Sequence, residues 1–248
     1  MEIIYTMWLR QIKKYWRSKT RMIGALGQPL LFLLAFGFGF GPIFEKAGQG
    51  NYIEFLAPGV IAMSILFTAM FTGIDVIWDR QFGFLKETLV APVSRIKIMV
   101  GRTLGGATVA LVQGLIVMAV CLLFGFTIQG ITSLLLAIVF MFLIALLFTA
   151  LGTAIASKLE DMQAFPLIMN FLIMPIFFLS GALFPLADLP KTISIIATLD
   201  PLSYGVDGLR GALVGASHYG IGYDLIVLSV LTFIVGLIGS YMFSKIEI

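Results

Sequence analysis

Six long apolar runs constrain the fold of this chain more than any other feature. They cover residues 22–44, 55–78, 103–126, 134–156, 164–184 and 221–243. A helix needs about 20 mostly apolar residues to cross the roughly 30 Å hydrocarbon core of a bilayer. The runs are apolar on every side, which argues against the alternating strands of a membrane barrel. Because a helix satisfies its own backbone in lipid, the sequence predicts a single all-α domain with six transmembrane helices.

The composition supports a membrane protein and excludes other classes. Hydrophobic residues make up 60% of the 248 residues and charged residues only 12%, against about 45–50% and 25% in soluble domains. Disorder, a coiled coil and an ordinary soluble domain are therefore excluded. The single cysteine, Cys121, cannot form an intrachain disulfide. The first run begins too late and is too long for a cleaved signal peptide, so we expect a mature N-terminus.

Basic residues predict the orientation of the spans. Most lie before the first run, between the second and third runs, at Lys158 and at Lys245, whereas the opposite side carries only Lys46, Lys191 and Arg210. Positive charge marks the cytoplasmic side of a membrane protein. Both termini and the loops 79–102 and 157–163 should therefore be cytoplasmic.

Residues 1–21 form a predicted amphipathic helix. Its apolar face carries aromatic and aliphatic residues at helical spacing: Ile4, Tyr5, Trp8, Leu9, Ile12, Tyr15 and Trp16. Basic residues recur on another face. Two tryptophans with a basic face suit a helix in the cytoplasmic headgroup layer. This helix either only anchors the topology or also presents a surface to a cytoplasmic partner.

A second short cytoplasmic helix is predicted at residues 82–90. It is amphipathic, with Lys86 and Glu87 among apolar residues, and Pro92 should end it because proline disfavours helix at the preceding residue. A rigid helix parallel to the membrane would transmit a force to both neighbouring spans. The pattern alone does not distinguish such a helix from a tethered loop.

The external segment 185–220 is too apolar for a solvated loop and too rich in proline and glycine for a span. We therefore expect short, broken re-entrant helices, with their non-helical backbone buried in protein or lining a cavity. Asp207 and Arg210 are three residues apart and would share a helix face. An ion pair between them could hold this cap closed; alternatively, both charges lie in the outer headgroup layer.

Chemistry-bearing motifs are scarce. The single histidine, His218, has no HExxH motif or metal-ligand spacing around it, and the sequence has no GxxxxGK[ST] phosphate loop. We therefore expect no enzyme, no metal and no cofactor bound by this chain. Of the polar residues within the runs, Asp75 and Asp224 are expected near the interface. Asn170, between Pro166 and Pro175, is the best candidate to face a cavity.

Methionine and phenylalanine residues cluster in the second and fifth runs. The clusters are Met63, Phe67, Met70 and Phe71 in the second run, and Phe171, Met174, Phe177 and Phe178 in the fifth. Most such residues pack in cores or face lipid. Flexible Met and flat Phe side chains also suit a surface that binds varied apolar ligands.

Three stretches resemble the type-two ABC export permeases. FFLSGALFPLADLP (177–190) and LDPLSYGVDGLRGALVG (199–215) are similar to that family's external segment, with a Pro-Leu-Ser-Tyr-x-x-Asp-x-x-Arg element at residues 201–210. DRQFGFLKETLVAPVSR (79–95) resembles its cytoplasmic loop, and LAPG (56–59) opens the second run. The resemblance is strongest to the daunorubicin-exporter-like branch, with nodulation-factor and polysaccharide exporters as relatives.

The resemblance implies a half-transporter. Two permeases, here expected to be identical, would each bind a separate cytoplasmic ATPase subunit that carries ATP and Mg²⁺. Segment 82–90 would be the coupling helix seated on that ATPase, and the second and fifth spans would line the path. The implied coupling residues are Arg80, Gly83, Leu85, Lys86, Glu87, Leu89, Pro92 and Arg95. The implied external gate comprises Ser180, Gly181, Pro185, Pro201, Tyr204, Asp207 and Arg210.

The predicted function is therefore ATP-driven export of an amphiphilic drug or lipid-like molecule across a prokaryotic cell membrane, with membrane lipid and no nucleic acid as a partner. Export of a lipid-linked glycan is an alternative. A lipid-modifying membrane enzyme would need clustered reactive groups, which His218 alone does not provide. A channel or secondary carrier would transport without any ATPase. Co-purification with a soluble ATPase separates these hypotheses.

Overall fold

The computed structural model describes residues 2–46, 51–90, 93–159, 161–186 and 190–246, and every regular element within them is helical. The fold prediction of an all-α protein is confirmed for this part of the chain. The elements are α1 (Glu2–Arg17), α2 (Lys19–Lys46), α3 (Tyr52–Gln81), α4 (Phe84–Val90), α5 (Arg95–Leu123), α6 (Ile131–Lys158), α7 (Ala164–Ile168), η1 (Met169–Ile173), α8 (Met174–Leu179), α9 (Lys191–Leu199), α10 (Pro201–Val214) and α11 (Ile221–Ser244).

Five helices are long and apolar enough to cross a membrane: α2, α3, α5, α6 and α11. They correspond to the first four and the last of the predicted runs. The fifth prediction, 164–184, needs correction. Its helix is shorter, Ala164–Leu179, and contains the π-helical turn η1. It ends there because Gly181 adopts a left-handed backbone with φ of 75°, a conformation that terminates helices.

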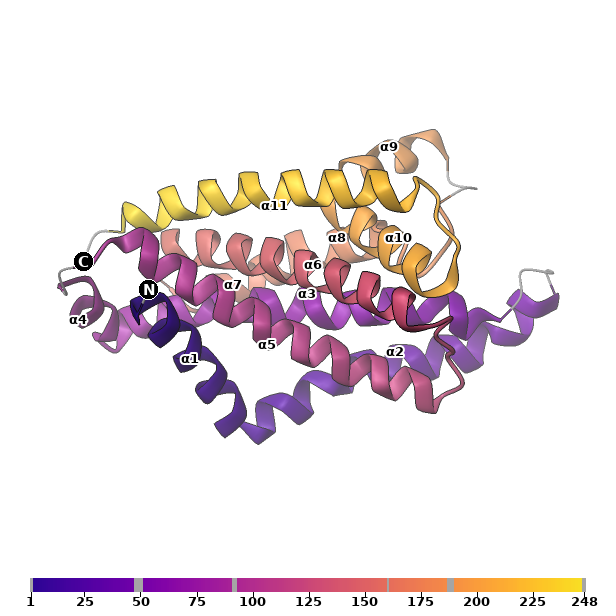
Figure 1. Cartoon of the computed structure of the whole chain (residues 1–248), viewed down its shortest axis with the longest axis horizontal. Helices are drawn as coiled ribbons and strands as arrows, with labels where there is room; N and C mark the ends of the chain where they lie inside the picture. The colour runs from indigo at the N-terminus through magenta and orange to yellow at the C-terminus, as the bar shows by residue number, and fades with distance from the viewer. Residues whose placement is uncertain (1, 47–50, 91–92, 160, 187–189, 247–248) are drawn as a thin grey trace.

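The helices form an elongated bundle with distinct ends (Figure 1). The short helix α4 and the C-terminus lie at one end, and α9 and α10 lie towards the other. Helix α3 is the most enclosed of the long helices and packs against α2, α5, α6 and α10. Helices α2 and α11 are the least buried of the five. The bundle thus has a central helix that reaches from α4 to the opposite end.

Glycines allow the central helices to approach closely. A Cβ atom added at Gly73 of α3 would lie 2.4 Å from the carbonyl oxygen of Gly152 in α6, closer than any real contact. Gly152 in turn lies against the backbone of Met70. Small residues at helix crossings give backbone-to-backbone packing in membranes, where hydrophobic burial gives little driving force. The α3–α6 crossing is therefore a tight contact of the bundle.

Helix α1 lies along α5 instead of standing apart from the bundle. Added Cβ atoms at Gly101 and Gly105 of α5 would meet Ile4, Met7 and Gln11 at 2.7–2.8 Å. The Trp8 indole donates a 3.1 Å hydrogen bond to Thr108 Oγ1. The predicted helix 1–21 is corrected at its end: α1 stops at Arg17, and Ser18 forms the corner before α2.

The buried face of α1 also differs from the predicted apolar face. Met7, Gln11 and Tyr15 are buried, whereas Tyr5 and Trp16 are largely exposed. The Tyr15 hydroxyl donates a hydrogen bond to the side-chain oxygen of Gln113 in α5. A polar contact inside the bundle, not only apolar spacing, therefore sets which side of α1 faces inward.

The external segment contains the predicted pair of short helices, α9 and α10, joined at Asp200. Nearly all of α10 is buried, because it packs among α3, α6 and α11. Its N-terminus is capped by Asp200, whose side chain accepts a 2.8 Å hydrogen bond from Leu202 N. The prediction that this segment is enclosed by protein holds for α10.

We predict that Gly73→Ala lowers the free energy of unfolding by about 1–3 kcal/mol, because the new methyl group must displace the backbone of α6. The gain in helix propensity, about 1 kcal/mol, offsets only part of this loss. Thermal denaturation of the detergent-purified permease measures the change. Gly27→Ala is the matched control, since nothing lies within 4 Å of Gly27. Equal shifts for both variants would contradict a tight α3–α6 contact.

Candidate functional site

Helix α4 connects α3 to α5 at one end of the bundle (Figure 1). Gly83, with φ of 79°, makes the sharp corner after α3 that L-residues with side chains disfavour. Leu85 is buried against the bundle, whereas Glu87 is exposed. Lys86 and Leu89 belong to α4, but their side chains lie outside the described atoms, and Pro92 lies outside the described residues. Helix α4 is thus anchored on one side and open on the other.

The two arginines that flank α4 bind backbone carbonyls. Arg80 donates a 3.4 Å hydrogen bond to the carbonyl of Leu159, after α6. Arg95 donates to the carbonyls of Ser244 at 2.7 Å and Ile246 at 3.0 Å. The structure therefore gives Arg95 a contact that the sequence did not suggest: it holds the C-terminal end of α11 against the start of α5.

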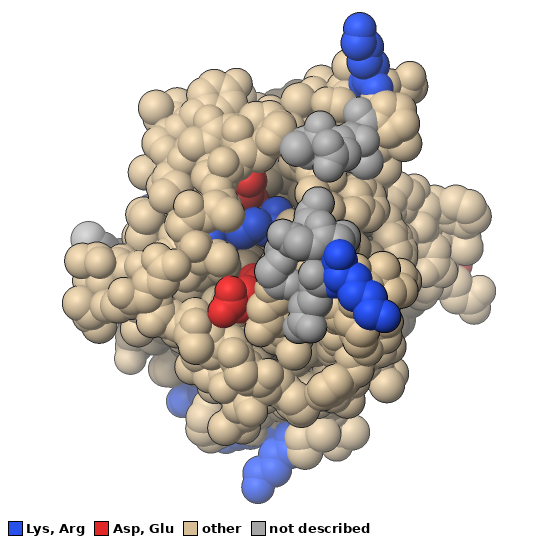
Figure 2. Space-filling view, turned by 90° about the vertical axis from the view of Figure 1, so that its right-hand side faces the viewer, with Lys and Arg blue, Asp and Glu red and all other residues tan. Residues whose placement is uncertain are grey.

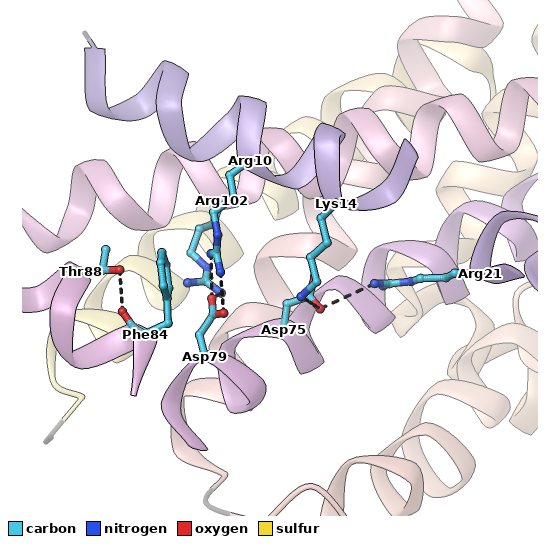
Figure 3. Close-up of polar contacts among 8 residues, drawn as sticks. All are labelled: Arg10, Lys14, Arg21, Asp75, Asp79, Phe84, Thr88 and Arg102. Carbon is cyan, nitrogen blue, oxygen red and sulfur yellow. Dashed lines mark hydrogen bonds and ion pairs between the residues drawn. The ribbon is translucent and has the colours of Figure 1, made fainter. Parts of the chain in front are cut away.

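An ionic cluster joins α1 to α3 beside α4 (Figure 3). Arg10 forms a two-pronged ion pair with Asp79, with contacts of 2.9 and 2.7 Å, and Lys14 contacts Asp75 at 2.7 Å. Residues 10 and 14 are four apart on α1, and residues 75 and 79 are four apart on α3. Side chains at this spacing share a helix face. The two helices therefore meet through matched rows of opposite charge.

Arg102 of α5 completes this cluster. Its guanidinium lies 2.5 Å from Asp79, and its side chain is only 2% exposed. The Arg10 guanidinium lies 3.9 Å from the ring centroid of Phe84 in α4, a cation–π geometry. Asp79 and Arg10 thus connect α1, α3, α4 and α5 at one point. We call Arg10, Lys14, Asp75, Asp79 and Arg102 the ionic cluster.

Sequence reasoning missed this cluster. Asp75 was expected at the membrane interface, but it is buried and paired; Asp79 was assigned to the loop, but it lies on α3. The sequence does contain a signal for this cluster: two basic residues four apart, at positions 10 and 14, and two acidic residues four apart, at positions 75 and 79. It could be recognised only by placing α1 beside α3, which depends on the glycine contacts with α5.

A cavity of about 580 Å³ opens between α1, α2 and α3. Three predicted path residues, Met63, Phe67 and Phe71, line it. Met70, predicted with them, is instead fully buried beside Gly152, because it lies on the side of α3 that faces α6. The volume falls in the range of small-molecule sites, about 300–1,000 Å³.

The predicted path residues of the fifth span have mixed surroundings. Phe177 is fully buried, and its ring centroid lies 6.3 Å from that of Phe67, which brings α8 and α3 together. Phe171 is 82% exposed, Phe178 is partly exposed, and Met174 is half-buried. Asn170 is exposed and does not line the cavity of α1, α2 and α3. The expectation that Asn170 faces a cavity therefore stays a prediction, for a path between two permeases.

At the external end, the predicted ion pair between Asp207 and Arg210 is absent. Arg210 instead donates a 2.9 Å hydrogen bond to the carbonyl of Gly181 and stacks 4.0 Å over the ring of Phe55. Burial lowers the pKa of Arg210 to about 10, partly countered by the charge of Asp207. Arg210 therefore fastens α10 to the turn after α8 and to the start of α3.

Asp207 accepts hydrogen bonds from the loop between α10 and α11. Its carboxylate takes the backbone N–H groups of His218 and Tyr219, each at 2.8 Å, and the Ser217 hydroxyl at 3.0 Å. These three donors satisfy the hydrogen-bonding capacity of the Asp207 carboxylate without an ion pair to Arg210. The end-on view of this side is mostly uncharged, with a few charged side chains set within a hollow (Figure 2).

The other predicted gate residues have structural contacts. Ser180 is buried and donates a 2.8 Å hydrogen bond to the Phe177 carbonyl, and the Tyr204 hydroxyl donates to the Thr198 carbonyl at 2.7 Å. Pro201 is the first residue of α10, and Pro185 lies half-buried in the connection after α8. These residues fix the geometry of the cap formed by α9 and α10.

A family model described as ABC-2 type transporter matches residues 2–214. The chain belongs to this family. The ABC-2 permease is a multi-pass integral membrane protein and a transport subunit without an ATPase domain, and permeases of this family pair with ABC ATPase subunits. This confirms the family-level resemblance.

Relatives of this permease include two kinds of protein. The ycf38 protein of Cyanophora paradoxa, named as a transport permease, is 28% identical over 93% of this chain and 83% of its own length. The ycf38 protein of Pyropia yezoensis is 31% identical over 81% of this chain and 70% of its own length. Nodulation protein J of Rhizobium leguminosarum bv. trifolii is 32% identical over 78% of this chain and 74% of its own length.

We predict that Asp79→Asn lowers the free energy of unfolding by about 3–5 kcal/mol, because it leaves the buried Arg102 guanidinium without its carboxylate. Denaturation of the purified permease measures the loss. Adding Arg102→Met should recover part of it, since removing both charges abolishes the uncompensated one. Asp161→Asn, at an exposed position, is the control. A loss no larger than that of the control would contradict the role of the cluster.

We also predict that the stability of the cap formed by α9 and α10 depends on pH. Burial raises the pKa of Asp200 to about 7, above the value of about 3.9 for an unfolded chain. The contribution of the protonated Asp200 carboxyl to the free energy of unfolding is therefore complete below pH 4 and is lost as the pH rises through 7. Asp200→Asn keeps the helix cap but cannot titrate. The protection factors of the first α10 amides, which correct for the faster intrinsic exchange at high pH, should be lower at pH 8 than at pH 5 in the wild type and equal at both pH values in the variant. Equal protection factors at pH 5 and pH 8 in the wild type would refute this prediction.

Proposed function

We propose that this chain is the permease half of an ATP-driven exporter. Two copies pair with each other and with two separate ATPase subunits, which carry ATP and Mg²⁺. The cargo is an amphiphilic drug or lipid-like molecule taken from the cytoplasm or the inner leaflet, as in the daunorubicin-exporter-like branch. The observation that carries this proposal is α4: a short helix held at the cytoplasmic end by buried Leu85, with Glu87 exposed.

The ionic cluster gives α4 a route to the rest of the bundle. A partner that pushes on α4 moves Phe84, which stacks with Arg10 at 3.9 Å. Arg10 is paired with Asp79 of α3, and Asp79 is paired with Arg102 of α5. Because Asp79 and Arg102 are buried, separating these two charges is costly and the helices that carry them move together. ATP-dependent movement of the partner can therefore tilt α1, α3 and α5 as one body.

Alternating access also needs a part of the bundle that can move relative to this body. Helix α2 is among the least buried of the long helices, and α7–α8 contains a π-helical turn, a local feature frequent at functional sites. Both helices border α3. Their exposed apolar side chains include Phe38, Phe171 and Phe178, which suit contact with lipid or with the second permease.

The decisive test is reconstitution. The permease, co-expressed with its candidate ATPase subunit, should co-purify with it and move a fluorescent amphiphile in proteoliposomes only when ATP is present on the ATPase side. Transport by the permease alone, at the same rate, would instead indicate a channel or secondary carrier and would contradict the proposal.

We predict that Glu87→Ala reduces cargo-stimulated ATP hydrolysis several-fold without altering folding or insertion, because Glu87 is exposed on α4 and free to contact the ATPase. Glu54→Ala, which removes an acidic residue at the opposite end of α3, is the matched control and should leave hydrolysis unchanged. ATPase activity of the purified complex gives the readout. Wild-type hydrolysis in the Glu87 variant would exclude a direct contact.

A further inference from the structure

The cavity between α1, α2 and α3 has the shape of a site for one elongated molecule. Its wall on α3 extends from Met63 to Trp78, a helical rise of about 22 Å. Phe67 and Phe71 on this wall, and Pro29 on the facing helix α2, make most of the lining apolar. Because the hydrocarbon core is about 30 Å thick, the cavity reaches from the cytoplasmic end of α3 to a depth near the bilayer centre.

One end of this cavity is charged. Asp75 contacts Lys14 at 2.7 Å and Arg21 at 3.6 Å, and all three residues line the cavity. Two cations therefore share one carboxylate, which leaves a net positive charge. The side chains of Lys14 and Arg21 are 41% and 32% exposed, whereas that of Asp75 is 6% exposed. The longer Arg21 contact leaves its guanidinium free to donate hydrogen bonds to another anion.

The deep part of the cavity contains a polar group without a partner. Ser64 lines the cavity and is 2% exposed, yet its hydroxyl makes no hydrogen bond within the described structure. A buried hydroxyl that lacks a partner is costly, and such groups need an explanation. Gln28 lines the same cavity. The Ser64 oxygen has almost no accessible surface even though the cavity is open, so the side chain that offers a polar group to a ligand on this side of the cavity is Gln28.

We propose that this cavity binds an amphiphile with an acidic headgroup, and that the acidic headgroup defines the cargo class of the exporter. The phosphate or carboxylate of the headgroup binds Arg21 and Lys14, and the apolar chain lies along Phe67 and Phe71. The identification of the bound amphiphile as cargo rests on the proposed export function, whereas binding itself requires no ATPase. The net positive charge selects against zwitterionic and cationic amphiphiles of the same chain length.

Quenching of Trp78 tests this proposal, because that indole lines the cavity. The full permease in detergent is titrated with phosphatidylglycerol carrying brominated acyl chains, and separately with brominated phosphatidylcholine. Quenching that disappears in Trp78→Phe comes from Trp78 and not from Trp8 or Trp16. Because this indole is 43% exposed, only the part of the quenching that Arg21→Gln removes reports the cavity. We expect phosphatidylglycerol to quench at about tenfold lower concentration, the effect of one charge-assisted hydrogen bond.

Two substitutions should shift this preference in opposite directions. Arg21→Gln should abolish the tenfold preference for phosphatidylglycerol, whereas Asp75→Asn should increase it, because it removes the competing carboxylate. Arg17→Gln, an exposed position on α1 outside the cavity, should leave it unchanged. Equal quenching by both lipids in the wild type, or the same direction of change in both variants, would overturn the proposal. If the preference holds but the reconstituted complex moves no amphiphile with ATP, the export function fails while the binding site stands.

Discussion

The contact of Asp79 with Arg10 and Arg102 is the interaction on which the half of this permease next to α4 depends. A carboxylate on a membrane-spanning helix is expensive unless it is paired. Here one buried carboxylate meets a guanidinium from α1 and another from α5. Any rotation or sliding of α1 would break the Arg10–Asp79 and Lys14–Asp75 ion pairs and leave Asp79 with Arg102 alone. The cluster therefore fixes the position of α1 more strictly than apolar packing could.

Glycine packing and ion pairing divide the bundle into a stiff part and a more adaptable part. Gly73 and Gly152 bring α3 and α6 into backbone contact, and Gly101 and Gly105 seat α1 on α5. The stiff part thus comprises α1, α3, α5 and α6, with α4 attached at one end. Helix α2 and the interrupted α7–α8 segment lie outside it and border α3. The cavity lies where α2 meets α3, at the boundary between the two parts.

Local patterns were enough to predict the long spans, the short helix α4 and the two external helices, because hydropathy and proline position act within one segment. The predictions that were wrong concern contacts between segments that are distant in the sequence. Asp207 and Arg210 share a helix face, but the backbone of His218 and Tyr219 binds one and the Gly181 carbonyl binds the other. Met70 faces α6 because of the glycine at position 152, which no feature of the second span reveals. The fifth span ends early because Gly181 adopts a left-handed conformation.

The central claim is that the ionic cluster makes α1 and α4 move as one body. Pulsed electron spin resonance tests it on the complete transporter in a Cys121→Ala background. Labels at Thr6→Cys and Thr88→Cys report the α1–α4 distance, and Thr88→Cys with Phe171→Cys reports a reference distance to η1. We predict that ATP trapping changes the reference distance but not the α1–α4 distance. We also predict that Asp79→Asn broadens the distribution of α1–α4 distances. Equal changes in both distances, or a narrow α1–α4 distribution without the carboxylate, would contradict the account.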